Sequence, residues 1–237
     1  MANKKSVIIF VTAGLWQLNG IKIAIKEGYD VLSIDEDSNA VGFKISKYKI
    51  NISLLQKNKI FKILKKLNLK YAGVLSYCSE AGMELCSEIS ERYKLNAPSL
   101  KTTRILTNKD KQRNLFSRNN ILQPYFKIFD DKEKLINFLK KNNDSLIVKP
   151  IDSSGSRGVF KYYKNIKNLK QHINNSFYWS KLKKVIIEKY IYGIELTVET
   201  FFQNGKMNIT AITSKKKIKK TNGTVAYELS TYKLSNY

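Results

Sequence analysis

The most informative part of the sequence is Leu146-Ile147-Val148-Lys149-Pro150-Ile151-Asp152-Ser153-Ser154-Gly155-Ser156-Arg157-Gly158-Val159. Lys149 lies near the end of a short apolar strand, and a loop rich in serine and glycine follows this strand. Gly155 and Gly158 let the backbone approach a ligand closely and take positive φ, and consecutive N–H groups in such a loop form an electropositive nest for phosphate. In the P-loop pattern the lysine follows the glycines, whereas here it precedes them. The stretch therefore predicts a nucleoside triphosphate site in a different kind of fold.

The composition is that of a globular protein with a large excess of positive charge. The 237 residues are 43% hydrophobic and 26% charged, which is ordinary for one large domain or two small ones. Lysine and arginine number 43 against 19 acids, so the net charge is +24, and the lysines are spread along the whole chain. Such a field attracts nucleic acid, anionic membranes or phosphorylated molecules. We interpret most of it as lysine-rich composition on a solvated surface, and nucleic acid ranks last among the expected partners.

Cysteine usage and hydropathy predict a cytoplasmic protein. No run approaches the roughly 18 apolar residues of a membrane helix, and we recognise no signal peptide at the N-terminus. Cys78 and Cys86 are too few for a disulfide framework, and the single His172 is too distant to form a metal site with them. We therefore expect reduced thiols and no membrane association.

The two halves of the chain carry different patterns. Apolar runs at 7–11, 29–35 and 72–76 alternate with helical patterns, which indicates βαβ units and a parallel sheet. The segment around Pro98 marks a boundary. In the second half, the runs 195–202 and 207–213 flank Asn204-Gly205, a turn dipeptide typical of a hairpin. We predict an α/β domain over residues 1–100 and an α+β domain over residues 101–237.

Several short signatures follow one another in a fixed order. They are Gly14-Leu15-Trp16-Gln17-Leu18 after the first strand, then Lys109, Lys149 with its loop, Glu188-Lys189-Tyr190-Ile191, and Glu195. In this order the chain resembles the ATP-grasp superfamily of the carboxylate–amine ligase type, which includes biotin carboxylase, carbamoyl phosphate synthetase and purine-pathway glycinamide enzymes. The resemblance implies a Rossmann-like (pre-ATP-grasp) domain, then an ATP-grasp domain truncated at its C-terminal end. It also implies ATP as the cofactor.

On this resemblance each signature has an implied place around ATP. Lys109 is the first basic contact, with Lys111 as the neighbouring alternative, and Lys149 lies at the α- and β-phosphates. The loop that closes over the phosphates comprises Ser154, Gly155, Ser156, Arg157, Gly158 and Val159. The adenine hinge comprises Glu188, Lys189, Tyr190 and Ile191, and Glu195 accepts the ribose hydroxyls. A solvated lysine or a serine–glycine turn is common by itself, so the prediction rests on their joint occurrence around one cavity.

The acceptor-substrate side is less well marked. In related enzymes the loop after the first strand and an acid after a later strand face the acceptor, and Gln17, Leu18 and Glu80 occupy those positions here. Glu80 equally suits a helix start, where a carboxylate is favourable to the helix dipole. Both interpretations stay open.

The chain departs from the family pattern beyond the hinge. The family places its magnesium ligands and a catalytic arginine on later strands, and no Glu-x-Asn-x-Arg run occurs in this sequence. No metal ligand and no catalytic residue is therefore assigned, and the Mg²⁺ ligands are expected downstream of Tyr237. A truncated or split enzyme, a fragment and a degenerate relative are all consistent with this pattern.

The resemblance implies an ATP-dependent ligase. A substrate carboxylate attacks the γ-phosphate, ADP leaves, and an amine or similar nucleophile captures the acyl phosphate with release of phosphate. The expected partners are small-molecule carboxylates and amines, with a homodimer or a complementing C-terminal polypeptide as a protein partner. The alternatives are a nucleotide-binding module without catalysis of its own and a dinucleotide oxidoreductase, which Asp35 suggests but the lack of G-x-G-x-x-G weakens.

Overall fold

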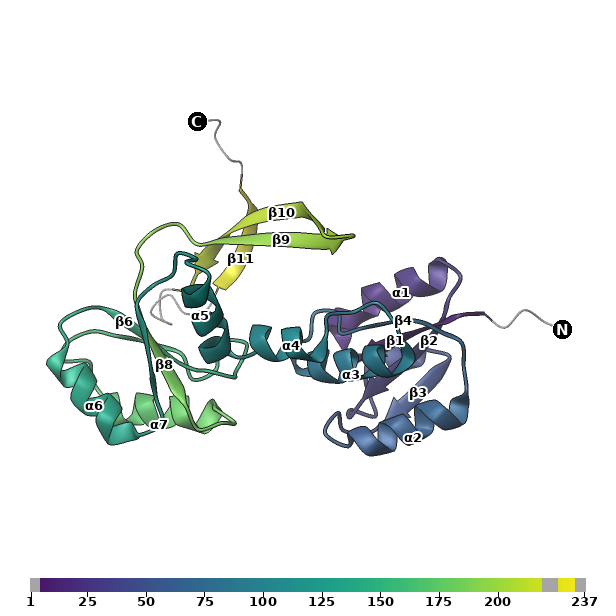
Figure 1. Cartoon of the computed structure of the whole chain (residues 1–237), viewed down its shortest axis with the longest axis horizontal. Coiled ribbons are helices and arrows are strands. Elements are labelled where there is room, and N and C mark those ends of the chain that lie inside the picture. The colour runs from purple at the N-terminus through teal and green to yellow at the C-terminus, as the bar shows by residue number, and fades with distance from the viewer. Residues whose placement is uncertain (1–4, 219–225, 233–237) are drawn as a thin grey trace. The chain divides into compact units, whose positions relative to one another are not determined.

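The structure is a computed structural model that describes residues 5–218 and 226–232 (Figure 1). Contacts divide the chain into two units, Met1–Thr107 and Asn108–Tyr237. Each unit is an α/β or α+β assembly with its own buried core.

The first unit is built on a parallel sheet. Its strands are β1 (Val7–Val11), β2 (Asp30–Asp35), β3 (Tyr48–Asn51) and β4 (Tyr71–Leu75), in the order β3-β2-β1-β4. Its helices are η1 (Leu15–Gln17), α1 (Leu18–Lys26), η2 (Val41–Lys44), α2 (Lys57–Leu67), η3 (Glu80–Gly82), α3 (Met83–Tyr93) and α4 (Leu100–Leu106). The predicted parallel α/β arrangement is confirmed.

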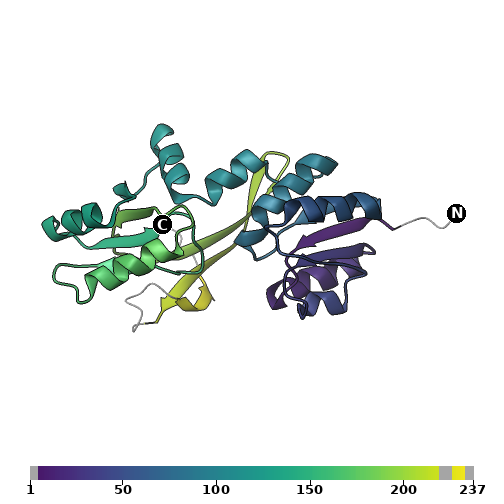
Figure 2. The same cartoon turned by 90° about the horizontal axis from the view of Figure 1, so that it is seen from below.

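Helices cover both faces of this sheet (Figure 2). Ile60 of α2 and Ile89 of α3 pack on one face, and Ile21 of α1 packs on the other. Burial on both faces explains why the strands are nearly continuous apolar runs. Contacts between α3 and α4 keep residues 100–106 in this unit, so the unit ends seven residues beyond the boundary drawn from the sequence.

The second unit contains two antiparallel sheets. The first has strands β5 (Phe126–Phe129), β6 (Leu146–Pro150), β7 (Phe160–Tyr162) and β8 (Val185–Lys189), in the order β5-β8-β6-β7. The second has β9 (Leu196–Gln203), β10 (Lys206–Lys217) and β11 (Ala226–Thr231), in the order β11-β10-β9. The helices are α5 (Lys109–Arg118), α6 (Lys132–Lys141) and α7 (Leu169–Trp179).

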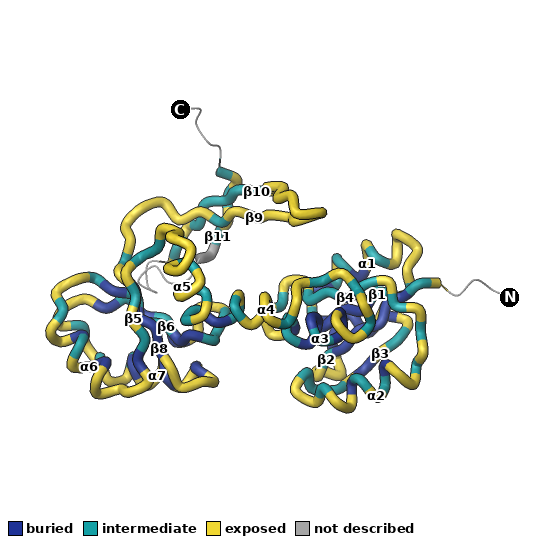
Figure 3. Tube along the Cα trace, viewed as in Figure 1, coloured by how far each residue is buried: buried dark blue, intermediate teal, exposed yellow. Residues whose placement is uncertain are grey.

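The β9–β10 hairpin confirms the turn predicted at Asn204-Gly205. Both residues have positive φ, 50° and 74°, as a type I′ turn requires. Unlike the buried strands β6 and β8, the hairpin exposes apolar side chains such as Val198, Phe202 and Met207 (Figure 3).

Candidate functional site

The β5-β8-β6-β7 sheet has one covered face and one face that carries the predicted nucleotide ligands. Leu146 and Val148 of β6 point into a core formed with α6 and α7. Because strand side chains alternate between faces, Ile147 and Lys149 point to the opposite face. The register sets Glu188 of β8 opposite Ile147. Lys149 and Glu188 therefore share the face away from α6 and α7, which we call the α5 face because Arg113 of α5 contacts Glu188 there.

Glu188 is the centre of a buried ion cluster on this face. Its Oε2 lies 2.7 Å from Nζ of Lys149, and its Oε1 lies 2.8 Å from Nε of Arg113 on α5. The Glu188 side chain is only 7% exposed, and the two cations are 19% and 16% exposed. Each carboxylate oxygen thus holds one cation in a largely water-free setting, where a charge needs a partner.

The two cations also set the titration of Glu188. Burial by itself raises the pKa of this carboxyl, but the hydrogen bond from Arg113 and the charge of Lys149 outweigh burial and lower the pKa below its usual 4.5. Glu188 is therefore ionised at neutral pH, and the sequence interpretation of Glu188 as an adenine-hinge residue missed this electrostatic role.

The glycine loop is fastened at both ends. At its start, Lys109 donates its backbone N–H to Ile151 O at 2.8 Å, and Lys109 Nζ donates to Ser153 O at 2.7 Å. At its end, the Ser176 hydroxyl of α7 donates to the buried Gly158 O at 2.5 Å. Lys109 thus reaches the loop that follows Lys149, whereas the alternative, Lys111, is exposed.

The loop apex between these anchors is exposed. Residues 155–157 are exposed, while Gly158 is buried. Arg157 folds back on the loop, donating from Nε to Ser154 O at 3.1 Å, and its guanidinium lies 5.1 Å from the centre of the Trp179 ring. Ser154 and Val159 are half-buried. The apex is the part of the loop that a ligand can contact.

Main-chain hydrogen bonds and the cation–π contacts of one lysine with two tyrosine rings hold the hinge segment at the end of β8. The N–H groups of Lys189 and Tyr190 donate to Tyr125 O and Ser145 O, each at 2.9 Å. Nζ of Lys161 on β7 lies 3.7 Å from the ring centre of Tyr190 and 4.8 Å from that of Tyr192. The next hinge residue, Ile191, is 67% exposed.

Glu195 lies in a different set of contacts. Its carboxylate pairs with Lys215 at 3.0 Å and with Lys217 at 2.5 Å, both on β10. Burial alone raises its pKa, but the two lysines lower it overall. The described contacts join Lys109 to the segment that follows Lys149, and Lys149 to Glu188. They pair Glu195 with β10 instead.

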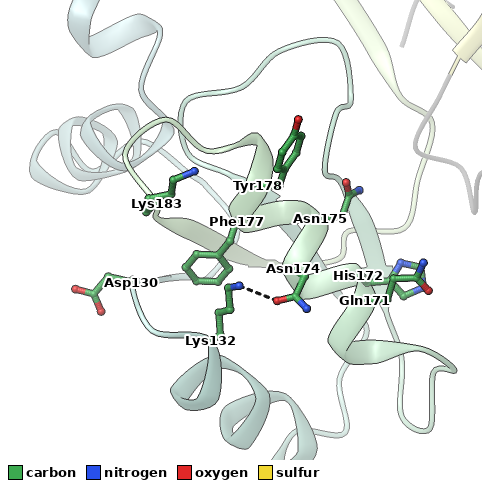
Figure 4. A pocket seen from close by; sticks show the side chains of 9 residues that line it. All are labelled: Asp130, Lys132, Gln171, His172, Asn174, Asn175, Phe177, Tyr178 and Lys183. Carbon is green, nitrogen blue, oxygen red and sulfur yellow. Dashed lines mark hydrogen bonds between the residues drawn. The ribbon is translucent and has the colours of Figure 1, made fainter.

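A cavity of about 930 Å³ in the second unit contains none of the predicted ligands. It lies beside α7, on the covered side of the sheet, and is lined by Asp130, Lys132, Gln171, His172, Asn174, Asn175, Phe177, Tyr178 and Lys183 (Figure 4). Asn174 points to Lys132, whose Nζ donates to it at 2.7 Å, whereas Tyr178 points away from Lys132. Most of its polar groups are exposed, so they do not converge on one ligand.

The predicted substrate residues lie after β1 and β4 of the first unit. Gln17 is buried and donates from Nε2 to Tyr77 O at 2.6 Å, which joins the loops that follow these two strands. Leu18 begins α1, and Glu80 begins η3 and is exposed. Asp35, which suggested a dinucleotide, accepts the Ala13 N–H at 2.7 Å. The adjacent parallel strands bring Gln17 and Glu80 to the same sheet edge.

Two further features concern metals and membranes. Within residues 5–218 and 226–232, no three His, Cys, Asp or Glu side chains gather closely enough to hold a metal ion. In the same part of the chain, no helix is long and apolar enough to cross a membrane.

Known proteins share both the sequence pattern and the fold. Residues 143–232 match the family model of the ATP-grasp domain. Over 193 residues, 77% of this chain, the sequence is 26% identical to formate-dependent phosphoribosylglycinamide formyltransferase of Prochlorococcus marinus (strain MIT 9301), of which the match covers 47%. Over 117 residues, 46% of this chain, it is 30% identical to phosphoribosylamine–glycine ligase of Pyrococcus horikoshii, of which it covers 26%.

A solved structure extends the likeness to the whole fold. N5-carboxyaminoimidazole synthetase from Staphylococcus aureus, complexed with ADP, superposes with a TM-score of 0.73 at 14% identity, covering 92% of this chain and 57% of that one. The chain spans about half the length of the first curated relative and about a quarter of the second. The chain is therefore similar to ATP-grasp proteins, with the domain itself matched over residues 143–232.

Proposed function

We propose that this chain binds ATP on the α5 face of the β5-β8-β6-β7 sheet, as the nucleotide-binding part of a carboxylate–amine ligase. The observation that carries the proposal is the joining of Lys109 to the loop that directly follows Lys149. Two cations and a glycine-containing loop at one place suit the phosphates of a nucleotide. The likeness in fold to a synthetase complexed with ADP is consistent with nucleotide binding by this chain.

The base and the ribose take the hinge side of this site. The N–H groups of Lys189 and Tyr190 are engaged within the protein, so the carbonyls of the hinge and the main chain of Ile191 are the groups we assign to adenine. Ile147, which is half-buried, lies on the same face as Lys149 and is the apolar side chain that we place against the base. Glu195 reaches the ribose only by leaving Lys215 and Lys217.

In the complete reaction, the oxygen of a substrate carboxylate bonds to the γ-phosphorus and ADP departs. The amine nitrogen then bonds to the acyl carbon, and phosphate leaves. We place the acceptor near Gln17, Leu18 and Glu80. The role we propose for this chain in that reaction is to bind and orient ATP. A homodimer or a second polypeptide would supply the remaining groups.

The proposal is tested by titrating MgATP into the 237-residue chain in a Trp16→Phe background. The chain has two tryptophans, and Trp179 lies against Arg157 of the loop, so its fluorescence reports ligand at the loop. We expect saturable binding, weakened at least about tenfold by Lys149→Met, because a charge-assisted phosphate contact is lost. Lys170→Met, on α7, is the charge-matched control and should bind as the parent does.

The result also separates the ligase from its alternatives. Binding of NAD with no response to MgATP would contradict the proposal and favour the oxidoreductase. Binding of MgATP without ADP release, in the presence of any candidate carboxylate and amine, would identify a nucleotide-binding module without catalysis of its own.

A further inference from the structure

Helix α5 links the glycine loop to the hinge strand through two cations. Lys109 and Arg113 are four residues apart, so their side chains lie on the same side of the helix. Lys109 Nζ contacts Ser153 O of the loop, and Arg113 Nε contacts Glu188 of β8. The helix thus touches both parts of the proposed nucleotide site.

The charges around Glu188 fit an exchange of partners. One buried carboxylate faces two cations, each on a different oxygen, so the cluster has one positive charge in excess. If Lys149 turned from Glu188 to an anionic phosphate, Arg113 would still neutralise the carboxylate. Without Arg113, the same movement would leave a buried, unpaired carboxylate, which is strongly unfavourable.

We propose that Arg113 is a positioning residue for nucleotide binding, which holds Glu188 as its counter-ion so that Lys149 can exchange this carboxylate for a phosphate. The inference rests on the proposed nucleotide site. It assigns Arg113 no contact with the nucleotide itself. A simpler role, in which Arg113 only fastens α5 to β8, makes a different prediction for the double variant described next.

The experiment is a double-mutant cycle of Arg113→Met and Glu188→Gln, read as MgADP affinity by calorimetry on the full chain. Arg113→Met should weaken MgADP by about tenfold, equivalent to roughly 1.4 kcal/mol, because Lys149 must then stay with Glu188. Glu188→Gln keeps the side-chain volume and the hinge backbone but removes the charge that retains Lys149. The double variant should therefore recover to within about threefold of Glu188→Gln alone, a strongly non-additive result.

Controls separate this inference from the proposed function. Arg118→Met, at the exposed end of α5, removes the same charge and should leave MgADP affinity unchanged. Arg113→Lys keeps a cation at this position, and its MgADP affinity should stay within about threefold of that of the parent. Circular dichroism checks that every variant is folded. If Arg113→Met does not fold, Arg113→Lys is the variant on which the inference is tested. Three results would overturn the inference: an unchanged MgADP affinity in Arg113→Met, a tenfold loss of affinity in Arg113→Lys, or a double variant that binds as weakly as Arg113→Met.

In each of these cases the proposed function stands if MgADP still binds the parent and Lys149→Met still weakens that binding. If the parent does not bind MgADP, the proposed function itself is wrong.

Discussion

Replacing Glu188 with alanine is expected to lower the free energy of unfolding of the second unit by about 3 kcal/mol. The side chain is 7% exposed and holds Arg113 and Lys149, both mostly buried. Its removal leaves two cations without a counter-ion in a poorly hydrated place, and the loss of a buried partner costs far more than that of a surface ion pair.

Urea unfolding in the Trp16→Phe background measures this effect, because Trp179 then reports the second unit alone. Glu228→Ala is the matched control: it removes an acid paired with Lys216 on the exposed β10–β11 ladder, and its unfolding midpoint should not change measurably. Equal midpoints for the two variants would contradict the assignment of Glu188 as the electrostatic centre of the site.

The same cluster predicts an acid-sensitive stability. The pKa of Glu188 is lower in the folded chain than its usual 4.5, so the unfolded chain binds this proton more readily. The stabilisation is fully present above the usual pKa and is lost as the pH falls through the depressed value. Glu188→Gln should therefore flatten the fall in stability below about pH 4.5, as measured by urea unfolding between pH 3 and 7. An unchanged slope would show that Glu188 is not ionised by its two partners.

The sequence predicted the elements that have strong periodic signals. β1 was predicted with its observed bounds, and the β9–β10 hairpin was predicted from an Asn-Gly dipeptide that admits positive φ. β3 and β7, which span four and three residues, were not predicted. α4 was not predicted because it lies in a polar segment. Its start does carry a helix signal, since Ser99 is the N-cap and accepts the Thr102 N–H at 3.2 Å.

The sequence singled out the motif residues of the candidate site, which stay a prediction, but it did not indicate the electrostatics around Glu188. Lys109, Lys149 and the loop were proposed as ligands because they stand in a recognisable order. Arg113 was missed because it belongs to no such signature, although its spacing of four from Lys109 on α5 places it on the same side of that helix. The partners of Glu195 could not be predicted, since a carboxylate between Lys215 and Lys217 depends on strand register, which the sequence does not display.

The two loop glycines should differ sharply when replaced with alanine. Both have positive φ, 65° for Gly155 and 70° for Gly158. A Cβ on Gly155 would have no atom within 4 Å, whereas one on Gly158 would lie 3.0 Å from Pro150 Cγ, 3.1 Å from Ser176 Cα and 3.2 Å from Asn175 O. Two of these atoms belong to the backbone of α7 and cannot move independently of the helix.

Gly158→Ala is therefore expected to lower the free energy of unfolding of the second unit by about 3 kcal/mol, from backbone strain and overpacking together. Gly155→Ala carries the backbone strain alone, about 1 kcal/mol, and serves as the control. Urea unfolding followed by Trp179 measures both. In MgADP titrations Gly155→Ala should lose more affinity than Gly158→Ala. The exposed apex at Gly155 is where we place the phosphates, whereas Gly158 packs against α7. A larger loss of stability in Gly155→Ala than in Gly158→Ala would contradict this division of the loop into a ligand-facing apex and an anchored end.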